Sequence, residues 1–409
     1  MSEYGSVVMP PSTRELSRKA AIVGIGETDY KQDYMAARAK APGYEPPTTE
    51  SLTITAFERA LADAGLKRED IDGLTVSFMY AGPSPAETAA FLGLKPRYQK
   101  VVAGIMAGPL PQVCAAIEAG ECDTVVMVYA AASRAIGRKF GGVRADDNPD
   151  KGTPAGYYYY HPWGWSAPAA YWAMVWNRYR DAYGVTEADL GSVAMQFRKN
   201  AMANPDAIMQ APMTIEDYLA SRYVVAPMHL FDMCLVNDGA VCLIVRRADL
   251  AKDMPHAPVE VAGWGEAKIK TKKLEGIIRD RMRPQFQESA RQALEMAGMD
   301  LKDIQHFEGY DSSSMHLINH LEGHGFVAPG EGLDFFKSGQ AAVGGSLPIN
   351  TAGGMLSGAY MHGWNHVVEV TRQLRHEAGA RQVKDVQISM SSLAQTDQVH
   401  PLIFTRGAE

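Results

Sequence analysis

Two copies of one short pattern, AAIVGIGE at residues 20–27 and VEVAGWGE at residues 259–266, decide the fold of this chain. Each copy begins with an apolar run of the kind that forms a buried strand. The copies share three residues in the same register, Gly24, Gly26 and Glu27 in the first and Gly263, Gly265 and Glu266 in the second. This self-similarity indicates one structural unit that occurs twice.

The segments that follow the two copies are also alike. TAFERALADAGLKREDIDGL, at residues 55–74, matches SARQALEMAGMDLKDIQHF, at residues 289–307. Each segment has apolar residues at helical spacing and then a glycine, Gly65 or Gly298, that is typical of a helix end. A strand is expected next, at GLTVS over residues 73–77 in the first copy. The order of strand, helix and strand predicts an α/β fold with parallel strands.

The duplication predicts two similar α/β halves that bury their sheets and share a central layer of helices. We expect a tail over residues 1–19, an N-terminal half over residues 20–255 and a C-terminal half over residues 256–409. The N-terminal half is expected to carry an insertion over about residues 130–230. Within it, YYYYHPWGW at residues 157–165 is either a packed loop or dimer contact, or a wall for a bulky apolar substrate.

Other elements follow from the same kinds of pattern. We expect a polar loop between Glu27 and Thr49, helices over residues 107–120, 167–183 and 186–203, a strand over residues 123–129, and a turn at residues 237–239 that leads into a buried strand. Pro109 and Pro111 fit the first of these helices because proline is tolerated in a first turn or at a bend.

The composition is that of a globular enzyme. The chain has 409 residues, of which 46% are hydrophobic and 21% charged, and its net charge is −7. This charge argues against nucleic acid as the main partner, because binding to phosphates requires a clustered cationic face. The first nineteen residues lack the apolar core of a signal peptide, and no apolar run approaches the roughly 20 residues that span a bilayer. We therefore expect a cytoplasmic protein with no membrane span.

Cysteine and histidine do not form the patterns of a metal site. The four cysteines are Cys114, Cys122, Cys234 and Cys242, and no two of them form a C-x-x-C pair. We expect them to be buried structural residues in a reducing compartment. His362 and His366 are spaced as i and i+4 on an expected helix, but they lack a nearby third ligand. No metal site is expected, and the same holds for the run of His316, His320 and His324.

Several segments together resemble the thiolase superfamily, closest to its sterol-carrier or lipid-transfer-protein branch. These segments are the duplicated halves, GECDTVVMV at residues 120–128, the run at residues 178–207, NDGAVCLIV at residues 237–245 and NTAGG at residues 350–354. The resemblance covers the chain from about Lys19 to Arg406. It implies a duplicated, five-layered α/β/α/β/α thiolase fold, a homodimeric core and acyl-CoA substrates.

The catalytic positions of a thiolase are not retained. The nucleophilic cysteine aligns at about Ala103, and the second cysteine near Ser391 or Ser392. Tyr310 and Tyr360 occupy the positions of the two catalytic histidines when the flanking motifs are held in register. An enzyme thioester is excluded at a site without a nucleophile, whereas a phenol can donate, accept or move a proton.

Two phenols can support a retro-aldol cleavage. One tyrosine removes the proton of a β-hydroxyl group, and the other handles the enolate that forms when the Cα–Cβ bond breaks. An unperturbed tyrosine has a pKa of about 10, so a base requires a lowered pKa or concerted transfer. We assign Tyr360 as the base and Tyr310 to the enolate, although the reverse assignment fits the sequence equally well. Neither a cofactor nor a metal is required if hydrogen-bond donors hold the enolate oxygen.

The paired tyrosines resemble those of the thiolase-like aldolases that cleave steroid side chains in bacterial lipid degradation. The resemblance implies a lyase that converts a 17-hydroxy steroid 20-carboxyl-CoA to a 17-keto steroid and propionyl-CoA. It also implies a heteromeric complex with a small zinc-ribbon and OB-fold partner protein. The sequence does not identify the residues that bind the steroid.

Supporting roles are expected for Asp311 and Asn350. Asp311 could position a tyrosine, or it could cap the helix that follows Ser312, Ser313 and Ser314. Asn350 could hold a water molecule or the oxyanion. Two other functions remain compatible with the sequence: a non-catalytic acyl-CoA or sterol-binding or lipid-transfer protein, and a thiolase that uses a displaced cysteine such as Cys114.

Overall fold

The computed structural model describes residues 11–78, 82–102, 105–106, 108–137, 167–268, 283–394 and 398–408. The aromatic segment at residues 157–165 and the position of Ala103 lie outside these ranges, so the interpretations made for them stay predictions. Among the helices of the described ranges, none combines the length and the apolar character needed to cross a bilayer.

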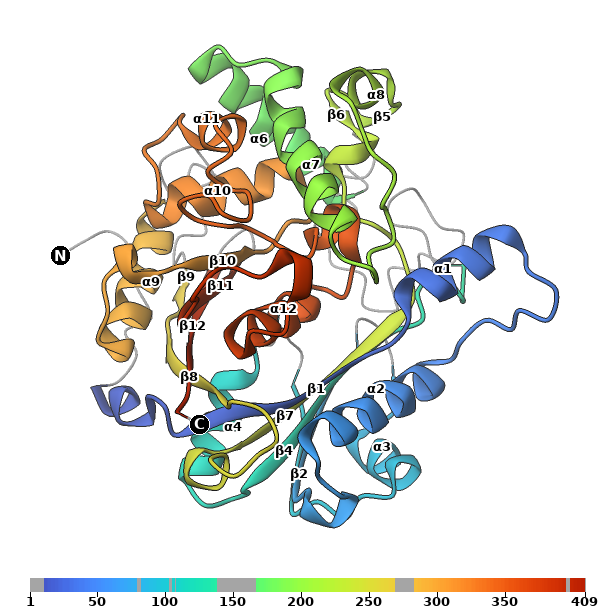
Figure 1. Ribbon diagram of the computed structural model, residues 1–409, viewed down its shortest axis with the longest axis vertical. Coiled ribbons are helices and arrows are strands. Elements are labelled where there is room, and N and C mark those ends of the chain that lie inside the picture. The colour runs from blue at the N-terminus through green and yellow to red at the C-terminus, as the bar shows by residue number, and fades with distance from the viewer. Residues whose placement is uncertain are drawn as a thin grey trace, which may run out of the picture.

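A mixed sheet of ten strands runs through the molecule (Figure 1). Its first-half strands are β1 (Ala20–Glu27), β2 (Gly73–Phe78), β3 (Tyr98–Val101), β4 (Thr124–Ala131) and β7 (Gly239–Arg247). Its second-half strands are β8 (Val259–Trp264), β9 (Ala267–Lys268), β10 (His306–Gly309), β11 (Ile388–Ala394) and β12 (Gln398–Arg406). Two further strands, β5 (Tyr223–Val225) and β6 (Met228–His229), pair separately.

The two halves of the large sheet share one topology. The strands β1, β7, β4 and β2 are paired antiparallel, antiparallel and parallel, and β8, β12, β11 and β10 are paired in the same way. The halves meet through β1 and β8, where Ala21 and Ile22 lie opposite Glu260 and Val259. Strands β1 and β2 run in the same direction, with β7 and β4 between them. This agreement confirms the duplicated α/β fold.

Helices cover both outer faces and fill the space between the two half-sheets (Figure 1). The helices are α1 (Tyr30–Ala39), α2 (Thr49–Ala64), α3 (Pro85–Leu92), α4 (Leu110–Glu118), α6 (Pro168–Tyr183), α7 (Glu187–Met202), α8 (Ile215–Ala220), α9 (Arg283–Ala297), α10 (Ser314–His324), α11 (Gly332–Lys337) and α12 (Trp364–Arg375). Helix α2 packs on β1, β4 and β7, and α9 packs on β8 and β12. Helix α12 contacts strands of both halves, and α4 packs on β7. The order of layers is therefore α/β/α/β/α, as expected.

The repeated glycines explain how the outer helices approach the sheet. A Cβ atom added at Gly26 would lie 2.0 Å from the carbonyl O of Ala56 in α2. A Cβ atom at Gly265 would lie 1.9 Å from the carbonyl O of Ser289 in α9. Any side chain would collide with the helix backbone, so the closeness of strand and helix requires glycine at these positions. The repeated glycines that reveal the duplication are thus also the positions at which strand and helix pack together in each half.

Most of the expected elements are present, and several regions differ from the prediction. Helix α2 ends at Gly65, whose φ is 64°, and α7 begins after Thr186, which accepts a hydrogen bond from Asp189 N. The loop expected between Glu27 and Thr49 is wrong, because α1 lies there. Only one residue of α1 is buried, so its sequence lacks the apolar stripe by which a helix is recognised. Helices α3, α8 and α11, strand β3 and the β5–β6 pair were not expected either.

Candidate active site

Tyr310 and Tyr360 meet in one buried cluster. Tyr310 follows the end of β10, and its amide N donates a 3.0 Å hydrogen bond to the carbonyl O of Ser392 on β11. Tyr360 follows a π-helical turn over Gly354–Gly358, and its amide N donates to Asn237 Oδ1 at 2.7 Å. The tyrosine side chains are 6% and 9% exposed, and a hydrogen bond joins them. The structure thus brings together the two residues that the sequence singled out.

The surroundings of Tyr310 keep its phenol protonated. Burial raises its pKa well above the usual value, and the nearby thiol of Cys234 raises it further. The hydrogen bond with Tyr360 works in the opposite direction but does not cancel the effect of burial. A phenolate is costly in such a site, because a buried charge loses its hydration. Of the two routes open to a tyrosine here, concerted proton transfer fits better than a preformed phenolate.

Asp311 holds the turn that precedes Tyr360. Its carboxylate oxygens accept hydrogen bonds of 3.0 and 2.9 Å from Met355 N, and Oδ2 also accepts one of 3.3 Å from Leu356 N. These amides belong to the π-helical turn, so Asp311 links the Tyr310 segment to the Tyr360 segment. Its alternative role as a helix cap is wrong, because α10 is capped by Ser313, whose hydroxyl accepts from His316 N at 3.2 Å.

Asn350 holds the peptide next to Tyr310. Its Oδ1 accepts a 2.8 Å hydrogen bond from Gly309 N, and its Nδ2 donates a 2.9 Å bond to the carbonyl O of Gly309. Asn350 has a φ of 46°, a left-handed conformation that asparagine tolerates better than most residues. Both ends of the amide are therefore engaged with the backbone. This geometry favours a positioning role over direct contact with the oxyanion.

A series of buried, charged side chains lies next to the tyrosine segments. His366 Nδ1 is 2.5 Å from Glu308 Oε2, and His366 Nε2 is 2.9 Å from Asp311 Oδ1. Burial alone would lower the pKa of His366, but the hydrogen bonds and charges of Asp311 and Glu308 raise it to about 10. His366 is therefore an imidazolium held between two carboxylates. The sequence did not reveal this role.

This series of buried polar and charged side chains continues along α12 and beyond its C-terminal end. Thr351 N donates to Glu308 Oε1 at 2.9 Å, and Thr351 Oγ1 donates to Glu369 Oε1 at 2.8 Å. Arg381 forms an ion pair of 2.9 Å with Glu369. Each buried charge in this series has a partner of opposite sign or a hydrogen-bond donor, as burial demands. The network fixes α12 against β10, the strand that ends directly before Tyr310.

His362 is a further residue that the sequence did not assign to the site. His362 and His366 were expected to lie on one helix, but this prediction is wrong. Helix α12 begins at Trp364, after His362, and Gly363 between them has a φ of 81°. The ring centroids of His362 and Tyr360 are 5.8 Å apart, and those of His362 and Tyr310 are 6.1 Å apart. The imidazole of His362 therefore lies next to the two tyrosines and is not part of the buried series of charged side chains around His366.

The cysteines have the environment of structural residues. Cys114 is fully buried in α4, and burial raises its pKa to about 12. Burial also raises the pKa of Cys122 and of Cys234 to about 12, although Cys234 is partly exposed and not fully buried as expected. A thiol nucleophile requires a lowered pKa, so these residues are poor candidates for a thiolase reaction. The expectation that Cys114 is a buried structural residue is confirmed.

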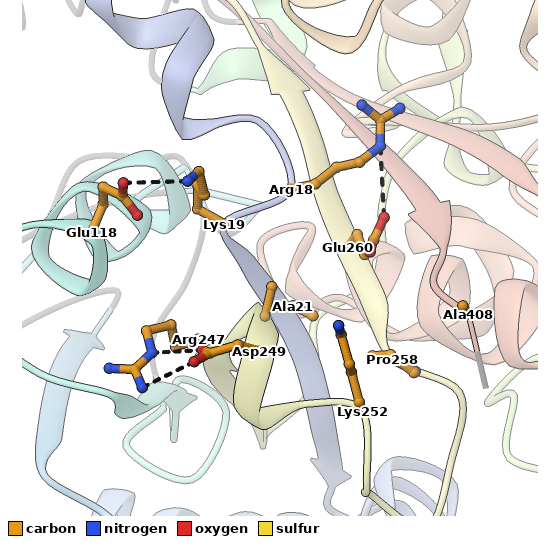
Figure 2. Close-up of a pocket in the computed structure, with 11 residues that line it drawn as sticks. Arg18, Lys19, Ala21, Glu118, Arg247, Asp249, Lys252, Pro258, Glu260 and Ala408 are labelled. Atoms are coloured by element: carbon orange, nitrogen blue, oxygen red, sulfur yellow. Dashed lines mark hydrogen bonds and ion pairs between the residues drawn. The ribbon is translucent and has the colours of Figure 1, made fainter.

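A surface cavity of about 450 Å³ lies where the start of β1 meets β7 and β8 (Figure 2). Neither tyrosine lines it. Figure 2 shows three of its cations paired with carboxylates: Arg18 with Glu260 at 3.6 Å, Lys19 with Glu118 at 3.5 Å and Arg247 with Asp249 at 2.6 Å. The fourth, Lys252, is drawn without a partner among the residues shown. Such paired, partly exposed charges are typical of an ordinary polar surface, and nothing in them indicates a reaction centre.

The sequence has relatives of known activity. It is 35% identical over 375 residues to the 17-hydroxy-3-oxo-4-pregnene-20-carboxyl-CoA lyase of Mycobacterium tuberculosis, with 88% of this chain and 92% of the relative covered. It is 34% identical over 367 residues to the steroid side-chain-cleaving aldolase of Thermomonospora curvata, with 87% and 90% covered. Residues 272–396 also match the thiolase C-terminal domain-like family.

Solved structures agree with these matches. The structure of the Ltp2-ChsH2(DUF35) aldolase superposes with a TM-score of 0.81 at 32% identity, and covers 96% of this chain and 99% of that chain. Human mitochondrial 3-ketoacyl-CoA thiolase superposes with a TM-score of 0.66 at 15% identity, over 95% of this chain and 99% of that chain. At such low identity the second likeness shows the thiolase fold alone.

Proposed function

The chain belongs to the steroid side-chain-cleaving aldolases of the thiolase superfamily, and we propose that it cleaves a β-hydroxyacyl-CoA by a retro-aldol reaction. The proposed substrate is a 17-hydroxy steroid 20-carboxyl-CoA, and the products are a 17-keto steroid and propionyl-CoA. The observation that carries the proposal is the hydrogen-bonded pair of buried phenols, Tyr310 and Tyr360, in a site whose described thiols are not activated.

The two tyrosines can move one proton from oxygen to carbon without forming a phenolate. Tyr360 accepts the proton of the β-hydroxyl as its own phenol proton passes to Tyr310, and Tyr310 delivers its proton to the α-carbon. The hydroxyl O–H bond and the Cα–Cβ bond break, while the ketone and a new Cα–H bond form. Both tyrosines end as neutral phenols, and the protons balance. The raised pKa of Tyr310 supports this concerted route over two separate ionisations.

Asp311 and Asn350 act in this proposal as positioning residues. Asp311 holds the turn before Tyr360, and Asn350 holds the peptide before Tyr310. A misplacement of either phenol would break the relay, because proton transfer requires donors and acceptors within about 3 Å of each other. The proposed substrate is a CoA thioester, and the proposed reaction uses no cofactor.

The proposed assembly is a homodimer that binds a small zinc-ribbon and OB-fold partner. Strand β3 supports the homodimer, because it is one of the two end strands of the sheet and its Val101 is 68% exposed. An open strand edge is a ready surface for pairing with a second chain. The solved relative has ChsH2(DUF35) in its name, which supports a DUF35-type partner. A cytoplasmic location stays a prediction.

The reaction can be tested with the full chain, alone and co-expressed with a DUF35-type protein. We expect incubation with 17-hydroxy-3-oxo-4-pregnene-20-carboxyl-CoA to yield a 17-keto steroid and propionyl-CoA in equal amounts, as measured by mass spectrometry. Tight binding of the substrate without turnover in either preparation would instead indicate a binding or lipid-transfer protein. Thiolytic products that appear only with added CoA would indicate a thiolase.

A further inference from the structure

His362 lies inside a ring of three tyrosines. Its ring centroid is 6.1 Å from that of Tyr310, 5.8 Å from that of Tyr360 and 5.8 Å from that of Tyr129 on β4. Tyr129 is itself held by stacking on Trp364, with centroids 5.8 Å apart and an interplanar angle of 18°. The imidazole is therefore fixed next to the atoms that we propose to move the proton.

The backbone of His362 directs the side chain into this position. Its φ is 52°, in the left-handed region that few residues other than glycine adopt. The next residue, Gly363, is also left-handed, and a hydrogen bond of 2.9 Å from Met106 N to the carbonyl O of His362 fixes the peptide. An unusual conformation that the surrounding structure maintains is common at functional sites.

The imidazole has polar atoms available for a ligand. His362 is partly exposed, whereas Met361 before it and both proposed catalytic tyrosines are buried. Within the described part of the chain, neither of its ring nitrogens takes part in a hydrogen bond. Tyr310 and Tyr360, by contrast, are bonded to each other. Among these residues, His362 is therefore the one whose imidazole is partly exposed and makes no hydrogen bond to another described residue.

The proposed reaction creates a demand that the two tyrosines do not meet. When the Cα–Cβ bond breaks, negative charge develops on the thioester oxygen, and a donor near this oxygen lowers the barrier. Burial lowers the pKa of His362 to about 4, so its imidazole is neutral at physiological pH. A neutral imidazole is a weak base toward a phenol, but its N–H stabilises an enolate well.

We propose that His362 is a third catalytic residue, whose imidazole N–H donates a hydrogen bond to the thioester oxygen as that oxygen gains enolate character. The inference rests on the proposed function and adds the group that stabilises the negative charge in its transition state. While Tyr310 and Tyr360 transfer the proton, His362 stabilises this charge. No proton is transferred to or from His362, so the balance of the reaction is unchanged.

The test compares variants that keep or remove the donor. His362→Leu removes it, and His362→Gln retains a side-chain N–H. His376→Leu is the matched control, because His376 also has a left-handed φ, of 62°, but caps the end of α12. Two rates are measured on the full chain with its partner: steroid-CoA cleavage, and exchange of the α-hydrogens of propionyl-CoA in D₂O. Exchange develops the same negative charge on the thioester oxygen but does not require the Cα–Cβ bond to break.

We expect His362→Leu to lower kcat for cleavage and the rate of exchange by about 10² to 10³-fold with little change in KM, as for the loss of one oxyanion donor. His362→Gln should recover at least about tenfold of this loss, and His376→Leu should match the wild type. Equal exchange in the wild type and His362→Leu, or a change in KM alone, would overturn the role of His362 while cleavage stands. Exchange without cleavage in the wild type would reject the steroid reaction alone, and absence of both would reject both.

Discussion

Asp311 Oδ2 occupies the space that a side chain at residue 354 would need. A Cβ atom added at Gly354 would lie 2.2 Å from this oxygen, and Gly354 has a φ of 58°. Gly354 is the first residue of the π-helical turn that Asp311 holds through Met355 N and Leu356 N. The turn and the carboxylate are therefore complementary in shape. The position of Tyr360, which follows this turn in the sequence, depends on that contact.

The Gly354→Ala change should disrupt this fit. Gly379→Ala is the matched control, because Gly379 has a similar φ of 60° and nothing within 4 Å of an added Cβ. We expect Gly379→Ala to lower the free energy of unfolding by only about 1 kcal/mol, the cost of a left-handed residue. Gly354→Ala should cost more and also lower kcat, because Asp311 must move. Urea denaturation and the cleavage assay measure both effects, and equal values for the two variants would contradict the account.

The Asn350→Gly change should separate backbone conformation from hydrogen bonding. Glycine accepts the φ of 46° without strain but lacks the two hydrogen bonds to Gly309. Loss of two buried hydrogen bonds should lower the free energy of unfolding by about 2 kcal/mol. We also expect kcat to fall while KM changes little, because the Tyr310 peptide loses its support. A variant with the activity of the wild type would show that Asn350 does not position Tyr310.

The His366 site should make stability depend on pH. Its folded pKa of about 10 exceeds the value of about 6.5 expected in the unfolded chain. Its contribution is therefore fully present below pH 6.5 or so and is lost as the pH rises through about 10. Glu308 behaves in the opposite sense: hydrogen bonds from His306 and His366 outweigh its burial and lower its pKa to about 2, so its contribution is lost as the pH falls from about 4.5.

The measurement is a comparison of the wild type with His366→Gln by urea denaturation between about pH 6 and pH 10.5. At neutral pH the variant should be less stable by about 3 to 5 kcal/mol, because Glu308 and Asp311 lose the charge between them. The difference should shrink as the pH rises through the pKa of His366. A difference that stays constant over this range would show that His366 is not charged in the folded protein.

Cysteine modification should leave the reaction intact. Burial raises the pKa of Cys114, Cys122 and Cys234 to about 12, so thiolate is scarce at neutral pH. We expect iodoacetamide to modify the native chain slowly and to leave cleavage unaffected. Rapid loss of activity in proportion to one modified cysteine, prevented by bound acyl-CoA, would instead favour a thiolase with a displaced nucleophile.

The sequence predicted the fold because its decisive residues are local and repeated. Gly26 and Gly265 mark the two places where a helix backbone touches a strand, and the flanking apolar runs mark the strands themselves. Helix α1 escaped notice because Tyr30 is its only buried residue. Tyr310 and Tyr360 were predicted as site residues because each stands near a motif that can be aligned with the thiolase pattern.

The rest of the site depends on contacts that spacing does not encode. Glu308 and His366 are distant in sequence, and each alone resembles an ordinary residue of a strand or helix. The interval from His362 to His366 suggested one helix face, but Gly363 turns the chain and sends the two imidazoles to different neighbours. Asn237 was predicted to lie in a turn before a buried strand and was given no role in the site, yet its side chain accepts a hydrogen bond from the amide of Tyr360.

The proton relay is tested most sharply by replacing each phenol in turn, with Tyr310→Phe and Tyr360→Phe. Tyr30→Phe is the matched control, because Tyr30 is 5% exposed and its hydroxyl donates a 2.9 Å hydrogen bond to Glu27 outside the proposed site. With steroid-CoA cleavage as the measurement, each site variant should lose about 10² to 10⁴-fold in kcat while remaining folded, and the control should retain its rate. Cleavage at the wild-type rate in both site variants would contradict the proton relay through Tyr310 and Tyr360.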